Sequence, residues 1–181
     1  MKIRFLVSGL FAFAAAGLNS CDEAKILTKD LSVPLSVDFV INEGVATSWD
    51  YAELLDAAAQ SSELETYKDV IQKVTIDKVT YTVTAFNGPA GQMLNTGFVD
   101  VADTTGGGRL TLAQMTNVNI PAALGNETEV PFDATAATKL TDLIKNSPHK
   151  ANVYTKGTVS AAPIDMTVKV KLYLTVQVEL L

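Results

Sequence analysis

The residue types that carry most enzyme chemistry are scarce in this chain of 181 residues, which holds one histidine, His149, and one cysteine, Cys21. A Ser-His-Asp triad needs a histidine as its base, and His149 is the only one available. Because His149 follows Pro148, after a predicted helix, we expect a solvated loop residue there. A zinc site of histidine and cysteine ligands needs more than one of each. The sequence therefore predicts a protein that is not an enzyme and that uses no cofactor.

Carboxylates could serve a metal ion in one stretch of the chain. Asp100 and Asp103 precede the glycine-rich residues 106–108, with hydroxyl groups at Thr104 and Thr105 between Asp103 and these glycines. Calcium takes six to eight oxygen ligands, and this loop could contribute some of them, although its spacing is not that of an EF-hand. Asp100 and Asp103 are accordingly weak metal candidates, and we expect no metal. Asp103-Thr104-Thr105 also resembles an acceptor motif for bacterial O-glycosylation, so calcium and glycan both stay open for the loop 100–108.

The charge of the chain excludes one class of partner. The net charge is −6, and Arg109 is the only arginine after Arg4. Because binding to a phosphate backbone depends on dense lysine and arginine, we expect no nucleic-acid partner. Gly106-Gly107-Gly108 lacks the lysine and the hydroxyl residue of a phosphate-binding loop, so we expect a mobile turn at these glycines.

The residues before Cys21 indicate a covalent modification of its thiol. Lys2 and Arg4 precede an apolar run over residues 5–16, and Gly17-Leu18-Asn19-Ser20 leads to the cysteine. A run of about a dozen apolar residues suits a signal peptide and falls short of the roughly 20 that a membrane-spanning helix needs. This order resembles a bacterial lipoprotein precursor. Leu18 and Ser20 fit the family pattern before the acylated cysteine, and Asn19 departs from it.

The resemblance implies that residues 1–20 are a signal peptide and that Cys21 becomes the first mature residue. Cys21 would carry a diacylglycerol thioether and an N-acyl chain such as palmitate, and two or more chains make a stable anchor. Residues 21–30 would form a lipidated tether of at most about 30 Å, followed by one domain over 31–181. A lone cysteine has no disulfide partner within the chain, which agrees with acylation. The alternative is an ordinary signal peptide cut after Ala16, which would give a secreted or periplasmic soluble protein.

The location within the envelope depends on the residues after the cysteine. Asp22 and Glu23 form an acidic pair there. In some bacterial lineages an acidic residue in this position retains a lipoprotein in the inner membrane, and in others an acidic cluster accompanies export to the cell surface. We expect the outer membrane or the cell surface. An acidic chain gains little from anionic lipid, so the acyl chains would hold the membrane, and other envelope proteins are the further partners.

The body of the chain has the pattern of β-strands. Residues 164–180 alternate apolar and polar side chains without a break, which is typical of a strand with one buried face and is longer than most strands. Residues 31–41 alternate likewise, and Pro34, which lacks an N–H, predicts an edge strand. A change of phase near Asp77-Lys78 predicts a bulge. We expect further strands at about 93–101, 109–113, 117–120, 127–132 and 151–161.

Three short helices are expected between these strands. Ser48 could cap a first helix over about 51–58, with Trp49 packing just before it. Ser62 and Glu65 match a capping box for a second helix. Asp133 could cap a third helix, which the run 146–148 (Asn-Ser-Pro) ends.

Together these elements predict a mainly β protein, an antiparallel β-sandwich of immunoglobulin-like architecture with about seven or more strands and two or three short helices. Our leading hypothesis is a lipid-anchored envelope lipoprotein that acts as a non-enzymatic binding or structural module. The alternative is a carrier of lipid or another apolar ligand in a cavity between long strands and helices. A less favoured hypothesis is a hydrolase of envelope polymers that uses His149 as its base.

Overall fold

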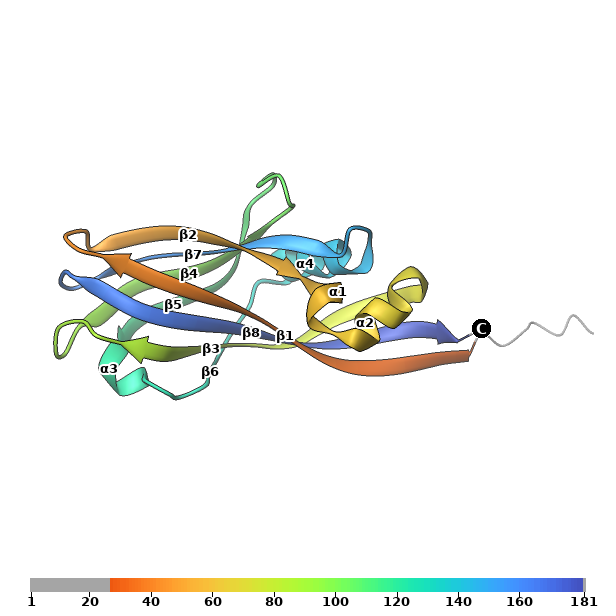
Figure 1. Cartoon of the computed structure of the whole chain (residues 1–181), viewed down its shortest axis with the longest axis horizontal. Helices are drawn as coiled ribbons and strands as arrows, with labels where there is room; N and C mark the ends of the chain where they lie inside the picture. The colour runs from red at the N-terminus through yellow and green to blue at the C-terminus, as the bar shows by residue number, and fades with distance from the viewer. Residues whose placement is uncertain (1–26, 181) are drawn as a thin grey trace, which may run out of the picture.

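Two antiparallel sheets of four strands each form the part of the protein described by a computed structural model, residues 27–180. The long sheet has the order β1-β8-β3-β6, and the short sheet has the order β2-β7-β4-β5. Figure 1 shows the two sheets layered along the long axis of the molecule. The predicted β-sandwich is confirmed, with eight strands. They are β1 (Leu27–Glu43), β2 (Ser48–Asp56), β3 (Ile71–Phe86), β4 (Met93–Ala102), β5 (Leu110–Asn119), β6 (Thr128–Val130), β7 (Lys150–Val159) and β8 (Ile164–Leu180).

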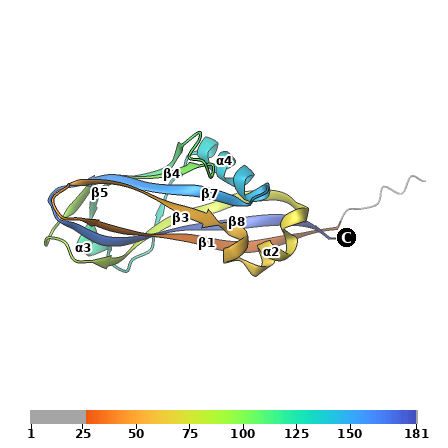
Figure 2. The same ribbon diagram turned by 45° about the horizontal axis from the view of Figure 1, so that its top comes forward.

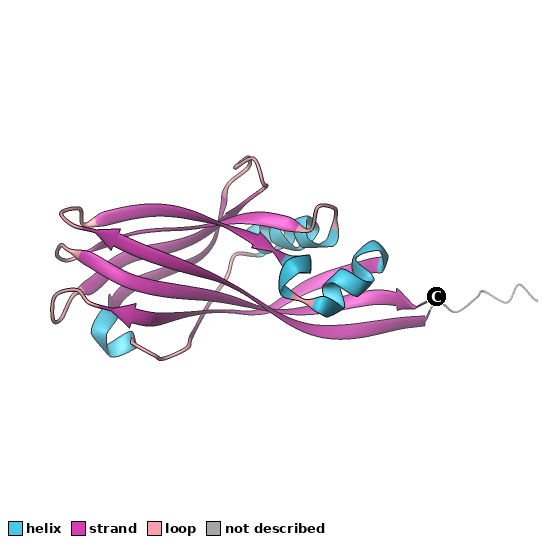
Figure 3. Cartoon of the chain, viewed as in Figure 1, coloured by secondary structure: helices cyan, strands magenta, loops and turns pink. Residues whose placement is uncertain are grey.

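Short helices fill the ends of the sandwich. In Figures 1 and 3, α1, α2 and α4 lie in the half of the molecule toward which the β1–β8 pair extends, and α3 lies near the opposite end. Residues 27–180 hold four α-helices rather than two or three, but α1 and α3 are single turns of four residues. The helical segments are α1 (Ala57–Gln60), α2 (Ser62–Tyr67), a 3₁₀ turn (Lys68–Val70), α3 (Ile120–Ala123) and α4 (Ala134–Lys145).

Strand β8 is the centre of the long sheet because both of its edges are paired. It pairs with β1 without a register shift from Leu27↔Leu180 to Glu43↔Ile164, and it pairs with β3 on its other side. Most apolar residues of its alternating pattern face the core and are buried, except for the half-buried Val168 and the exposed Leu180, while the polar ones lie on the outer face. Each buried valine or leucine contributes about 1.5–3 kcal/mol of transfer free energy. The predicted long strand is confirmed.

Strand β1 is an edge strand, as Pro34 predicted. The Ser36 N–H donates to the Gln60 Oε1 at 2.9 Å, and the Gln60 Nε2 donates back to the Ser36 carbonyl at 2.9 Å. Ser36 therefore turns its main-chain groups away from β8. Pro34, two residues earlier, shares this orientation, so the N–H that it lacks would have pointed to the open edge. The Gln60 side chain acts as a one-residue substitute for a neighbouring strand.

Strand β3 contains the predicted bulge. Its pairing with β8 shifts register between Ile76 and Lys78, and also at two further points along the strand. On both sides of the shift the apolar residues are buried, with Val74 and Ile76 before it and Val79 and Tyr81 after it. The extra residue lets both stretches face the core although their parity differs.

The helix expected after Ser48 is wrong, because residues 48–56 form strand β2. Nine residues of β2 pair with β7 without a shift, from Ser48↔Thr158 to Asp56↔Lys150. Trp49 is buried in this strand opposite Gly157 and does not precede a helix. A Cβ added to Gly157 would stand only 2.6 Å from the Trp49 ring, so the glycine leaves room for this ring. The long-range partner β7 decides the local conformation here.

The other two predicted helices are present in the structure. Helix α2 begins one residue earlier than the capping box implied, because Ser61 is the N-cap and its Oγ accepts from the Leu64 N–H at 3.2 Å. Helix α4 is confirmed, with the Asp133 side chain accepting from two N–H groups of its first turn. Its buried face consists of Ala136, Ala137, Leu140 and Ile144.

Two boundaries differ from the sequence prediction. The stretches 109–113 and 117–120 form the single strand β5, in which Asn117 takes a φ of 55°. Residues 27–30, expected as the end of a tether, already pair with residues 177–180 in the long sheet. No helix within residues 27–180 is long and apolar enough to cross a membrane.

Candidate functional site

The glycine-rich loop between β4 and β5 is held in shape by Asp103. The Asp103 Oδ1 accepts from the Thr105 N–H at 2.9 Å, from the Thr105 Oγ1 at 2.6 Å and from the Gly107 N–H at 2.8 Å. These hydrogen bonds, from the Thr105 hydroxyl first, hold the pKa of Asp103 below its usual value. Gly106 and Gly108 adopt φ values of +85° and +60°, which favour glycine. The loop expected as a mobile turn is thus closed by a specific set of hydrogen bonds.

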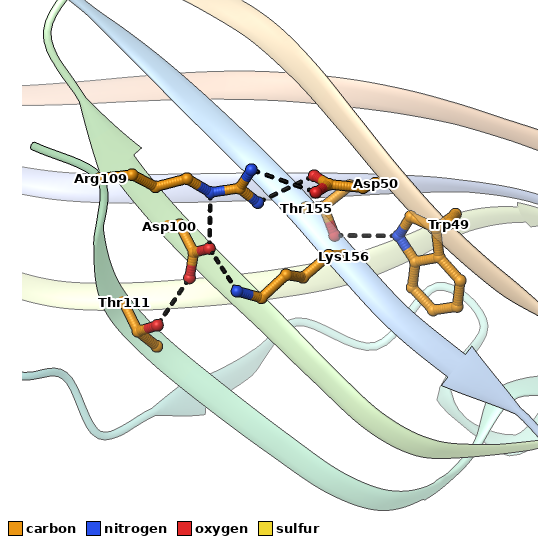
Figure 4. Close-up of polar contacts among 7 residues, drawn as sticks. All are labelled: Trp49, Asp50, Asp100, Arg109, Thr111, Thr155 and Lys156. Carbon is orange, nitrogen blue, oxygen red and sulfur yellow. Dashed lines mark hydrogen bonds and ion pairs between the residues drawn. The ribbon is translucent and has the colours of Figure 1, made fainter. Parts of the chain in front are cut away.

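Asp100 lies at the centre of an ion cluster on the outer face of the short sheet (Figure 4). Its side chain is 2% exposed and accepts from the Arg109 Nε, the Lys156 Nζ and the Thr111 Oγ1, each at 2.8 Å. Arg109 also forms a two-pronged ion pair with Asp50, at 2.8 and 3.1 Å. Burial by itself raises the pKa of Asp100, but the hydrogen bonds from Lys156, Thr111 and Arg109 outweigh burial and hold the pKa below its usual value.

Aromatic rings cover this ion cluster. The Arg109 guanidinium lies 4.0 Å from the centre of the Tyr154 ring, and the Lys156 ammonium lies 5.2 Å from that of Phe98. Cations over ring faces gain electrostatic energy while the rings exclude water. The cluster thus joins all four strands of the short sheet to one another and to Arg109 at the end of the loop.

The structure does not bring the two metal candidates together. Asp100 directs its oxygens to Arg109, Lys156 and Thr111, whereas Asp103 directs one of its oxygens into its own loop. A carboxylate that is neutralised by two cations is a poor ligand for a third. Within residues 27–180 no group of three or more His, Cys, Asp or Glu side chains is arranged to hold a metal ion.

An open groove of about 720 Å³ runs between helix α4 and the loop that Asp103 organises. Figure 2 shows α4 beside this loop. The Lys139 Nζ donates to the Gly107 carbonyl at 3.0 Å and so joins the helix to the loop. We call this hollow the α4 groove. It is lined by Asp103, Leu110, Ala134, Thr135, Thr138, Lys139, Asp142, Leu143, Asn146, Ser147 and Pro148.

The lining of the α4 groove is mixed in character. Leu110 and Leu143 give it apolar surface, the Thr135 and Thr138 hydroxyls lie along the exposed helix face, and Asp142 adds a negative charge. The volume lies within the usual range of ligand-binding clefts, about 300–1,000 Å³. Sequence reasoning missed this site because a polar helix face looks the same whether it borders a groove or open water. The apolar positions of this helix predict which face is buried, and this is the only sequence feature that bears on the groove.

His149 is buried, which corrects the solvated loop residue expected from the sequence. Its Nδ1 lies 2.9 Å from the Ile144 carbonyl, and its own carbonyl accepts from the Ala57 N–H at 3.1 Å. Because a carbonyl oxygen only accepts, the Nδ1 must carry a proton. The ring and the main-chain carbonyl of His149 together tie the end of α4 to the start of α1. Within residues 27–180 its ring makes no hydrogen bond to another side chain.

A second, smaller groove of about 390 Å³ lies on the other side of the Ser147-Pro148 turn. It borders His149 and contains two ion pairs, Lys150 with Asp56 at 2.8 Å and Lys68 with Glu65 at 2.6 Å. Lys150 and the Ala59 N–H hold the pKa of Asp56 below its usual value. These groups are already paired with one another, so the larger α4 groove is the better binding candidate.

The space between the sheets is small. An apolar gap lined by residues such as Trp49, Leu94, Gly97, Met115 and Met166 has a volume of about 30 Å³. This volume has room for about two water molecules. An acyl chain does not fit into it, which counts against the carrier alternative.

The residues of the predicted leader lie outside the described part of the chain. This applies to the signal peptide over 1–20, to Cys21 and to the first residues of the tether, 22–26. The described part of the chain begins with β1 at Leu27, which is six residues after Cys21.

Comparisons with known proteins do not assign a family. No family model matches the chain, and no curated protein matches it. Solved structures of plant virus proteins are distantly similar in shape. One from Desmodium yellow mottle tymovirus is 14% identical with a TM-score of 0.35, over 100% of this chain and 98% of that chain. One from turnip yellow mosaic virus is 12% identical with a TM-score of 0.36, over 99% and 93%.

Proposed function

We propose that this protein is a lipid-anchored, non-enzymatic binding module of the bacterial envelope. The observation that carries the proposal is the leader, in which two basic residues and an apolar run precede Leu18-Asn19-Ser20-Cys21. Acylation of Cys21 would attach the sandwich to a membrane, with the outer membrane or the cell surface as the favoured location. The α4 groove would then be the contact surface for another envelope protein.

The geometry of the fold is compatible with such an anchor. Strand β1 begins at one end of the long axis (Figure 1), so a tether that precedes it would be attached at that end. The six residues 21–26 span at most about 20 Å when extended. An anchored domain would therefore stay next to the bilayer while its α4 groove remained open to solvent.

The contacts of the most reactive side chains support a non-enzymatic role. Asp100 is neutralised by two cations, Asp103 organises its loop, and His149 joins two helices. Each of these side chains has a structural role that accounts for its surroundings. None of them needs a substrate to explain its position.

The anchor is tested by producing the full chain with its leader in bacteria and separating membranes from soluble fractions. We expect the protein in the membrane fraction, released by detergent but not by salt or carbonate. Cys21→Ala should move it to the soluble fraction or leave it unprocessed, whereas Ser20→Ala, which keeps a small residue before the cysteine, should not. Membrane association of a Cys21→Ala protein that has lost residues 1–20 would contradict the proposal. A soluble wild-type protein starting at Gly17 would favour cleavage after Ala16.

A further inference from the structure

The row of core-facing apolar side chains on β1 and β8 extends beyond the elements that cover it. Leu27 and Leu180 are direct partners in the β1–β8 pair and share the face on which Leu31 and Val178 are buried. Nevertheless Leu27 is 65% exposed and Leu180 is 36% exposed. Two leucines on the inner face of the sandwich therefore lie open at the end where the described chain begins.

The cover ends because the neighbouring elements are shorter. Strand β3 starts at Ile71, which pairs with Val178, so beyond this point β1 is the only strand within residues 27–180 that pairs with β8. Helix α2 ends at Tyr67, and the Lys29 ammonium lies 5.6 Å from the centre of the Tyr67 ring. In Figure 1 the β1–β8 pair projects past the helices at this end. We call residues 27–29 and 178–180 the terminal ribbon.

We propose that the terminal ribbon rests on the lipid bilayer, with Leu27 and Leu180 in the interfacial region. This inference rests on the proposed acylation of Cys21. With that anchor, the extended segment 21–26 places the bilayer within about 20 Å of Leu27. Exposed apolar side chains held this close to a membrane lose water contact when they enter it.

The contact is driven by apolar burial and not by lipid charge. Around the two leucines, the positive charge of Lys29 is offset by Asp30 and by Glu179, which accepts from the Gln72 amide at 2.8 Å. Two leucines bury too little surface to bind a membrane on their own. They act only when the acyl anchor supplies a high local concentration of bilayer. The contact should therefore be insensitive to anionic lipid and absent from the unacylated chain.

The contact would orient the whole domain. The hairpin at Val45, the loops 87–92 and 160–163, and α3 lie at the opposite end of the long axis (Figure 1). Val45 is 94% exposed there. With the terminal ribbon on the bilayer, this far end points away from the membrane, and the α4 groove lies to the side.

The test uses the acylated full-length protein in phosphatidylcholine vesicles, with and without phosphatidylglycerol. The thioether on Cys21 leaves a newly introduced cysteine as the single site for a polarity-sensitive fluorophore. Leu27→Cys and Leu180→Cys report on the terminal ribbon, and Val45→Cys is the control at the far end. We expect a blue shift and loss of emission with nitroxide-labelled lipid at residues 27 and 180, none at 45, and no dependence on phosphatidylglycerol.

The unlabelled protein supplies an independent measurement. Amide hydrogen exchange at residues 28–30 should be slower in the acylated protein on vesicles than in the unacylated Cys21→Ala chain in detergent-free solution. Equal quenching at residues 27 and 45 on vesicles would overturn the inference and leave the anchor intact. A concentration-dependent blue shift at residue 27 without vesicles would show that a second copy covers the ribbon, which also overturns it. Failure of the wild-type protein to float with vesicles would instead refute the anchor itself.

Discussion

The ion cluster around Asp100 allows a sharp test of what stabilises the short sheet. Asp100→Asn keeps the size of the side chain and an acceptor for the Thr111 hydroxyl, but it removes the negative charge that faces Arg109 and Lys156. Both cations were paired with this carboxylate at 2.8 Å. Arg109 retains its ion pair with Asp50, so Lys156 loses the most.

The expected loss of stability follows from the burial of the Asp100 carboxylate and from the contacts that Arg109 and Lys156 keep without it. Removing one partner of a fully buried ion pair costs about 3–5 kcal/mol because the other charge is left uncompensated. Here Arg109 and Lys156 are 28% and 38% exposed, so water partly replaces the lost carboxylate. We therefore expect a loss of about 2–3 kcal/mol in the free energy of unfolding, with loss of charge-assisted hydrogen bonds as the main cause. For a domain of this size the melting temperature should fall by about 4–12 °C.

The loss should also depend on pH in a defined direction. The pKa of Asp100 is lower in the folded protein than in the unfolded chain. Its contribution is therefore complete above the unfolded pKa, about 3.9, and disappears as the pH falls through the lower, folded pKa. The difference between wild type and Asp100→Asn should be constant from pH 7 to about 5 and should shrink below about 4.

Urea unfolding followed by the fluorescence of Trp49, the single and buried tryptophan, measures these values. Both variants should carry Cys21→Ala so that acylation plays no part. The matched control is Glu53→Gln on β2 of the same sheet, which makes the same change of charge at an exposed position and should alter stability by less than about 0.5 kcal/mol. A cost for Asp100→Asn as small as that of the control, or one that grows toward pH 3, would refute the reasoning.

Three further predictions concern the packing of the strands. Gly157→Ala would place a Cβ 2.5 Å from the Thr96 carbonyl and 2.6 Å from the Trp49 ring, so it should cost about 1–3 kcal/mol in urea unfolding, whereas the control Gly44→Ala, with open space around it, should cost little. Gln60→Ala removes both hydrogen bonds to Ser36, so it should cost about 1 kcal/mol and raise self-association in sedimentation experiments by exposing the β1 edge, an expectation that a strictly monomeric variant would contradict. Leu174→Ala in the middle of β8 should cost about 2–5 kcal/mol, and a value near that of Thr175→Ala, a half-buried residue on the outer face, would mean that β8 is not central to the core.

Local periodicity explains why the long strands could be predicted. The alternation over 164–180, the proline on the outward phase of β1 and the phase change in β3 each reflect one strand and its two faces. Such features are properties of a short stretch of chain, so they can be read without knowing the partners.

Long-range pairing explains what the sequence could not reveal. Residues 48–56 have apolar side chains compatible with a helix, but β7, which lies about 100 residues later, makes them a strand. His149 is buried because α1 reaches it from the other half of the chain. The Asp100 cluster joins residues 50, 109 and 156, whose proximity depends on the order of strands in the short sheet.

The intact mass of the mature protein tests the central claim most directly. The full chain, produced in bacteria with its leader, would be extracted from membranes with detergent and measured by mass spectrometry with fragmentation of its N-terminus. A chain that starts at Cys21 and carries a diacylglycerol, with or without an amide-linked palmitate, is the predicted result. An unmodified chain that starts at Gly17, or one that keeps residues 1–20, would contradict the account.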